Sequence, residues 1–137
     1  MTGTGVFAAA TSVEQVAEVQ GDGTRTAFSA SINDGWDIGG NANGGYLMAI
    51  AGRAMAAAAG RPPLTLTAHY LRPAPAGPCT IDVDLVRSGR RLATARASLR
   101  IGGKPTLELL GTFGDQQPDD ATTYEREAPA DVTPYDE

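Results

Sequence analysis

The feature that most constrains the fold is an alanine-rich segment, Leu47–Ala59, which follows a glycine-rich stretch, Trp36–Tyr46. The alanine-rich segment holds one charged residue, Arg53, and no proline, while Gly60 and the Pro-Pro pair after it are helix stop signals. A helix that is apolar on nearly every side is a buried helix. At about 1.5 Å per residue it is about 20 Å long, too short to span a membrane. The sequence therefore predicts a central helix wrapped by other elements.

Extended segments lie on both sides of this helix. Val13–Gln20 and Arg25–Ile32, separated by Gly-Asp-Gly-Thr, predict a β-hairpin. Four more extended segments follow the helix: Leu64–Arg72, Thr80–Arg87, Arg91–Ile101 and Thr106–Phe113. In the second of these, Ile81, Val83 and Leu85 are expected to point inward. Polarity with a period of two, interrupted by short glycine turns, predicts an antiparallel meander with one solvated face.

The order of hairpin, buried helix and four-stranded meander is that of an α+β hot-dog fold, in which a curved antiparallel sheet wraps around one long central helix. A chain of 137 residues has the size of one domain. We expect a flexible N-terminus over residues 1–12, the hot-dog domain over 13–114, and an acidic, proline-rich tail or linker over 115–137.

Charge and composition exclude several function classes. Residues 115–137 hold eight acidic residues and one basic residue, and the rest of the chain holds ten basic and eight acidic residues. Residues 1–114 are therefore mildly basic, which suits a phosphate-bearing ligand. A single cysteine, Cys79, and an N-terminus without the charge of a signal peptide predict a cytoplasmic protein. One histidine and one cysteine do not complete a zinc site, and no phosphate-loop or dinucleotide motif is present. We expect no metal, cofactor, nucleic acid or membrane partner.

Three short motifs resemble, in order, the N-terminal half of type II acyl-CoA thioesterases: Asn43–Leu47 (NGGYL), Thr67–Pro73 (TAHYLRP) and Val86–Arg90 (VRSGR). Members of that family carry two hot-dog halves, and their catalytic carboxylate, hydroxyl and glutamine are associated mainly with the second half. The resemblance implies an acyl-CoA substrate, hydrolysed to free acid and coenzyme A without a cofactor. It also implies a homodimer or pairing with a second half. The alternative is a non-catalytic half that binds acyl-CoA or completes the scaffold.

The helix start supplies the main candidate site. The amides of Gly44 and Gly45, with the helix dipole, would polarise a thioester carbonyl, unless the glycines serve only close packing. The spacing of Asp37, Gly40 and Asn43 is similar to the active-site stretch of hydroxybenzoyl-CoA-type thioesterases, in which the aspartate is nucleophile or base. Asp37 is therefore a candidate catalytic carboxylate, Asn43 a candidate substrate contact, and an ordinary turn aspartate the alternative.

Other candidates lie outside the glycine-rich stretch or at its ends. His69, the only histidine, could orient water, although a partly buried sheet histidine is the alternative. Trp36 and Tyr46 would line or close the acyl pocket, and plain packing explains them equally well. Arg90 and Arg91, at a turn, are candidate contacts for the coenzyme A phosphates.

Overall fold

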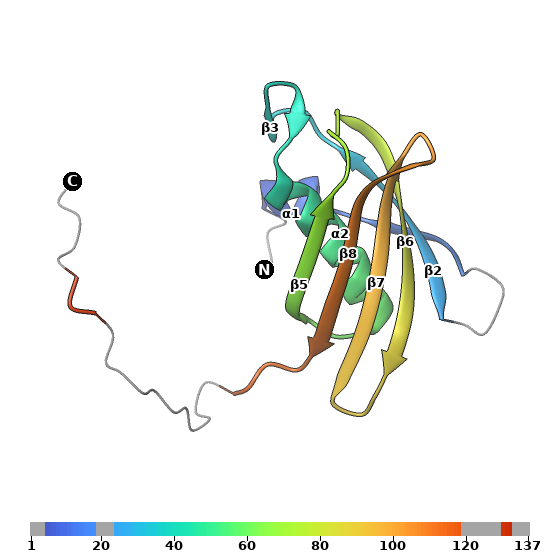
Figure 1. The fold of residues 1–137 in the computed structure, drawn as a ribbon, viewed down its shortest axis with the longest axis vertical. Helices are drawn as coiled ribbons and strands as arrows, with labels where there is room; N and C mark the ends of the chain where they lie inside the picture. Colours follow the sequence, from blue (N-terminus) through green and yellow to red (C-terminus); the bar gives the residue numbers. More distant parts are fainter. Residues whose placement is uncertain (1–4, 19–23, 119–129, 133–137) are drawn as a thin grey trace.

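The computed structural model describes residues 5–18, 24–118 and 130–132. A six-stranded antiparallel sheet curves around one long helix, α2 (Gly44–Ala59), so the predicted hot-dog fold is confirmed (Figure 1). The helix ends at the predicted residue because Gly60 follows it in the left-handed conformation, with a φ of 66°. Within the described ranges, no helix is both long and apolar enough to cross a membrane.

The sheet contains every extended segment that the sequence predicts. Its strands are β1 (Glu14–Glu18), β2 (Arg25–Ile32), β5 (Pro63–Tyr70), β6 (Gly77–Ser88), β7 (Leu92–Ile101) and β8 (Lys104–Gly114), in the order β1-β2-β6-β7-β8-β5. The predicted N-terminal hairpin is confirmed, since β1 pairs antiparallel with β2. Most of its predicted turn lies in residues 19–23, outside the described ranges.

The predicted four-stranded meander is wrong in one connection. β6, β7 and β8 are consecutive neighbours, but β5 pairs with β8 and not with β6, whose other neighbour is β2. The connection from β5 to β6, residues 71–76, contains two prolines and leads from one edge of the sheet to its middle. On its way it meets the start of α2, where the Ala42 N–H donates to the Ala74 carbonyl oxygen at 2.8 Å.

The N-terminal segment contains a helix that the sequence does not predict. Val6–Ala10 form a short helix, α1, and the residue after it, Thr11, is fully buried. The Arg53 guanidinium donates to the Ala8 carbonyl oxygen at 2.7 Å, which holds α1 against α2. Residues 1–4 and most of the predicted tail over 115–137 lie outside the described ranges.

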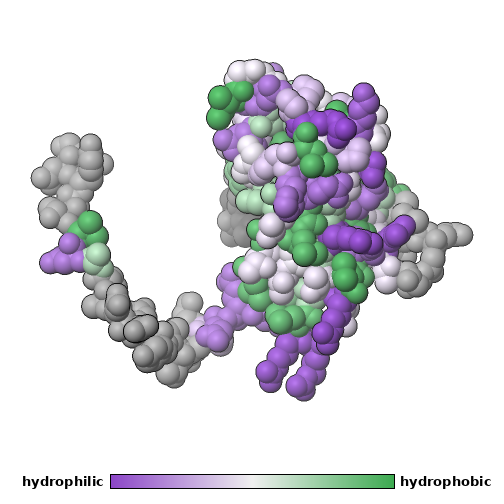
Figure 2. All heavy atoms as spheres, in the orientation of Figure 1, coloured by the Kyte–Doolittle hydropathy of each residue, from purple (hydrophilic) through white to green (hydrophobic). Residues whose placement is uncertain are grey.

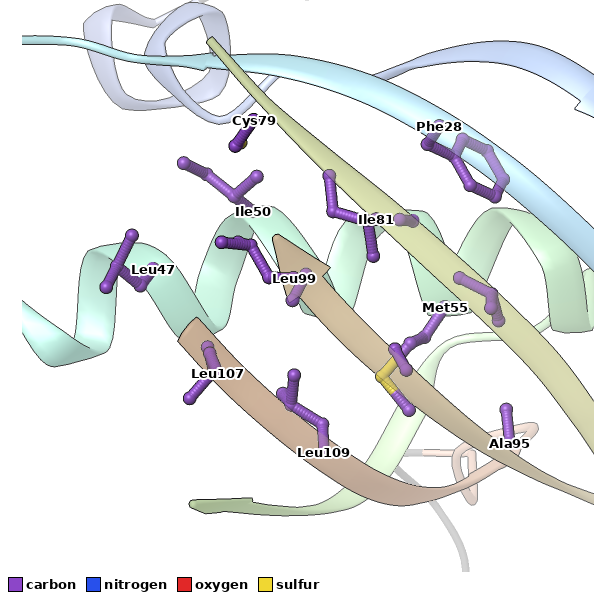
Figure 3. Close-up of a cluster of buried hydrophobic side chains, with 14 of the residues drawn as sticks. Phe28, Leu47, Ile50, Met55, Cys79, Ile81, Ala95, Leu99, Leu107 and Leu109 are labelled. Atoms are coloured by element: carbon purple, nitrogen blue, oxygen red, sulfur yellow. The ribbon is translucent and has the colours of Figure 1, made fainter. Parts of the chain in front are cut away.

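The core lies between α2 and the concave face of the sheet. Figure 3 shows Ile50 and Met55 of the helix beside Ile81 and Leu99 of the strands, and all four side chains are fully buried. The inward orientation predicted for alternate residues of β6 is confirmed for Ile81 and Val83, whose exposed fractions are 0% and 1%. The residues of β7 that face the helix are mostly alanines, which let the sheet approach the alanine-rich helix closely.

Candidate active site at the start of the central helix

The glycine-rich stretch before α2 folds into a small hairpin of β3 (Asp37–Ile38) and β4 (Asn41–Ala42). Gly39 and Gly40 at its turn both have positive φ angles, 62° and 84°, as a two-residue turn of type I′ requires. At the base of the hairpin, the Asn43 N–H donates to the Trp36 carbonyl oxygen at 2.8 Å. The glycine-rich stretch therefore holds Asn43, the residue before α2, in place.

The start of α2 is capped by a side chain. The Asn43 Oδ1 atom accepts hydrogen bonds from the Gly45 N–H at 2.9 Å and from the Tyr46 N–H at 3.4 Å. Of the two amides expected from the sequence to polarise a carbonyl, that of Gly45 is therefore already bonded to the Asn43 side chain. The Gly44 N–H has no hydrogen-bond partner among the described residues. A carbonyl oxygen placed here would meet one unpaired amide and one amide shared with the Asn43 side chain.

A groove of about 350 Å³ opens beside this helix start. One wall comes from the β4 strand and α2, and the other from the end of β5 and the connection after it: Asn41, Ala42, Gly44 and Leu47 face Tyr70, Leu71, Arg72, Pro73 and Ala74. The Tyr70 hydroxyl donates to the Gly44 carbonyl oxygen at 2.7 Å. A Cβ on residue 44 would lie 3.1 Å from the Tyr70 ring, so glycine allows this close approach.

Sequence reasoning selected His69 on this strand and missed Tyr70. Successive strand residues point to opposite faces, and the residues of β5 that are half-buried against the helix are Leu66 and Ala68. Tyr70 shares their face, whereas His69 is exposed on the outer face, opposite Glu108 of β8 in the strand register. The structure therefore does not bring His69 to the helix start, nor is it partly buried. Because alternate residues of a strand share a face, the apolar residues Leu66 and Ala68 were the sequence signal that Tyr70 also faces the helix.

The Asp37 carboxylate is engaged within the loop. Its Oδ1 atom accepts the Gly35 N–H at 3.2 Å, and its Oδ2 atom accepts the Gly40 N–H at 2.9 Å. These contacts are those of an aspartate that organises a turn. Asp37 and Asp34 line a separate small cavity of about 120 Å³, not the groove beside Gly44. A catalytic role for Asp37 requires that one of its oxygens leave the loop.

Trp36 and Tyr46 form an aromatic stack beside α1. Their ring centroids are 5.5 Å apart, and the Phe7 ring of α1 packs edge-on against Trp36 at 5.3 Å. The Tyr46 side chain is buried, and its hydroxyl donates to the Ala10 carbonyl oxygen and accepts the Asn33 N–H. Neither aromatic residue lines the groove. The observed contacts are those of packing, the alternative that the sequence left open.

The two predicted phosphate contacts, Arg90 and Arg91, lie at the other end of the molecule. Arg61, just after the C-terminal end of α2, donates to the Arg90 carbonyl oxygen at 2.8 Å. Hydrophilic side chains gather at this end, by the turn between β6 and β7 (Figure 2). With 16 residues, α2 separates this turn from Gly44 by about 24 Å. The arginine that lines the groove is Arg72, which donates to the Pro105 carbonyl oxygen.

Cys79 is a poor nucleophile in this fold. Its side chain is buried in the core, and burial raises the pKa of the thiol from 9.0 to about 11. The thiolate fraction of the folded chain at pH 8 is then about a hundredfold lower than that of an ordinary cysteine. We expect alkylation by iodoacetamide at pH 8 to be slower in the native chain than in urea by at least about that factor. Equal rates would contradict the buried thiol.

A curved antiparallel sheet around one long helix that begins with a glycine pair beside a groove defines a hot-dog domain. Residues 32–114 match the family model of the acyl-CoA thioesterase N-terminal domain. The chain belongs to this family, as the three sequence motifs predict.

Two solved structures and one further protein sequence are similar to this chain. A structure from Thermobifida fusca, assigned as a thioesterase II, superposes with a TM-score of 0.80 at 28% identity and covers 91% of this chain and 45% of the other. A variant of the phenylacetic acid degradation protein PaaI from Thermus thermophilus shares the fold, with a TM-score of 0.66 at 24% identity over 76% of this chain and 93% of the other. An uncharacterised protein of Mycobacterium tuberculosis is 26% identical over 97 residues, which are 66% of this chain and 33% of the relative. The chain thus spans about a third of the length of this relative.

Proposed function

We propose that this domain acts in the hydrolysis of acyl-CoA thioesters to free acid and coenzyme A. The observation that carries the proposal is the groove at the start of α2, which Gly44 lines and beside which Gly45 follows in the first turn of the helix. Amides at a helix N-terminus stabilise the negative charge that develops on a carbonyl oxygen during acyl transfer. Membership of the acyl-CoA thioesterase N-terminal domain family supports the thioester as the bond attacked.

The lining of the groove suits a coenzyme A thioester in part. Leu47 and Leu71 offer apolar contacts, and Arg72 offers a cation at the same end of α2 as Gly44. A guanidinium is suited to a phosphate group. A ligand at Gly44 would reach Arg90 and Arg91 of the same chain only by running the length of α2, so we assign the nearer phosphate contact to Arg72.

The groove lacks its own general base. Its lining residues include no aspartate, glutamate or histidine, and a base must lie within hydrogen-bond reach of the attacking water. The strand that lines the groove, β5, is one of the two edge strands of the described sheet and has an unpaired edge. We propose that a second hot-dog unit, either another copy or a second half, pairs at this edge and completes the site. Light scattering on the purified chain tests the homodimer, and a monomer would contradict it.

The alternative is a non-catalytic half that binds acyl-CoA or completes the scaffold. Two observations favour it. Both carboxylate oxygens of Asp37 already accept loop amides, and the domain spans 45% of the Thermobifida thioesterase II. On this view, the chemistry resides in the second unit, and this chain supplies only the binding groove.

One assay separates the two functions. The purified chain is incubated with a series of acyl-CoA lengths and thiol release is followed, beside Asp37→Asn and a matched exposed control, Asp115→Asn. If Asp37 is the base, its variant should lose about 10²- to 10⁴-fold in rate while the control keeps the wild-type rate. Equal rates in all three chains would exclude Asp37 alone. The absence of thiol release from the wild-type chain would contradict catalysis by this chain and favour the scaffold.

A further inference from the structure

Tyr70 joins the edge strand β5 to the first turn of α2. Its hydroxyl donates to the Gly44 carbonyl oxygen at 2.7 Å, and its ring lies so close that a Cβ on residue 44 would be 3.1 Å from it. We propose that Tyr70 is a positioning residue for the thioester carbonyl, acting through the peptide group that links Gly44 to Gly45. This inference rests on the function proposed above.

The chemical link is the peptide group itself. The Gly44 carbonyl oxygen and the Gly45 N–H belong to the same peptide unit. A hydrogen bond donated to the oxygen of a peptide polarises it and strengthens its N–H as a donor, by about 10–30% per bond. The Tyr70 hydroxyl therefore strengthens the Gly45 N–H, one of the two amides that would meet the carbonyl oxygen of the substrate.

The hydrogen bond is additional to what the helix needs. In an α-helix, a carbonyl in the first turn already accepts the N–H of the residue four positions later. The Tyr70 side chain is also half exposed, so its burial contributes little to the core. The Tyr70 hydroxyl therefore adds a hydrogen bond at the wall of the groove, beyond those that the helix makes itself.

The hydrogen bond from Tyr70 matters because the Gly45 N–H already has an acceptor. Its N–H donates to the Asn43 Oδ1 atom at 2.9 Å, so a substrate carbonyl must share this donor or displace the side chain. A stronger donor can support two acceptors better than a weak one. Tyr70 thus favours the charged oxygen of the transition state over the neutral amide oxygen of Asn43, because a more polarised N–H gains more from a full negative charge.

The test is Tyr70→Phe, which removes the hydroxyl and keeps the ring. The matched control is Thr67→Val, which removes a hydroxyl from the same strand on its outer face. We expect the Tyr70 variant to lose about 3- to 10-fold in kcat, as the loss of one hydrogen bond predicts, with a rise in KM of about 3-fold at most and an unchanged melting temperature. The Thr67 variant should keep both kinetic constants. A wild-type kcat in Tyr70→Phe, or a rise in KM alone, would overturn the inference.

A binding measurement separates this inference from the proposed function. The probes are a dethia analogue of acyl-CoA, in which a methylene replaces the sulfur and the carbonyl stays, and an alkyl-CoA thioether that lacks the carbonyl. The wild-type chain should prefer the carbonyl-bearing probe, and Tyr70→Phe should reduce that preference about 3-fold or more. This result in a chain that releases no thiol would contradict its catalysis but support the role of Tyr70. No preference in the wild-type chain would overturn the inference.

Discussion

Replacing Leu107 by alanine is expected to lower the free energy of unfolding by about 2–5 kcal/mol. Leu107 lies on β8, its side chain is 0% exposed, and it points into the core between the sheet and α2 (Figure 3). The truncation removes buried apolar surface and leaves a cavity that the close-packed helix and strands fill only in part. Urea unfolding followed by circular dichroism measures the loss.

Leu110 is the control for this substitution. It lies three residues further along the same strand, on the outer face, with 53% of its side chain exposed. Leu110→Ala makes the same chemical change and should alter the free energy of unfolding by less than about 1 kcal/mol. Equal losses in the two variants would show that β8 does not present Leu107 to the core as described.

This pair also shows what sequence alternation determines. It identifies the face on which a strand residue lies, and for β6 and β7 the inward positions follow from the sequence alone. It does not identify the neighbouring strand, because every strand of one curved sheet carries the same pattern. For that reason β5 was expected beside β6, whereas it pairs with β8 across the sheet. The connection of residues 71–76, which contains two prolines and is longer than most hairpin loops, was evidence in the sequence against a tight hairpin between β5 and β6.

The candidate site was predictable where it depends on local chemistry. The glycine pair, Gly44 and Gly45, was identified from the order of residue types before the helix, although the helix begins at Gly44 and not at Leu47, and Asn43 caps it. Contacts between distant segments were not. The Tyr70 hydroxyl reaches Gly44 only because β5 runs antiparallel to β8 along the helix. The distance between Arg90 and Gly44 could not be predicted either, because a hairpin turn in the sequence does not show at which end of the helix it lies.

Replacing Gly45 by proline is expected to lower kcat by about 10²- to 10³-fold, the usual effect of removing one oxyanion donor. Proline is tolerated in the first turn of a helix, so the change deletes the N–H while α2 can still form. Gly45→Ala is the control. It keeps the N–H, and its added Cβ would lie 3.2 Å from the Asn43 Oδ1 atom, a contact that a small shift of the Asn43 side chain relieves.

The measurement is kcat for both variants on the best acyl-CoA substrate, with circular dichroism to verify the helix. Gly45→Ala should stay within about tenfold of the wild-type rate, since its donor remains. A folded Gly45→Pro chain with the wild-type rate would show that the unpaired Gly44 N–H alone stabilises the oxyanion. The double variant, Gly45→Pro with Tyr70→Phe, then tests whether Tyr70 acts through the Gly45 N–H. Because Tyr70 acts through the Gly45 N–H, its substitution should cause no further loss in kcat once that N–H is gone.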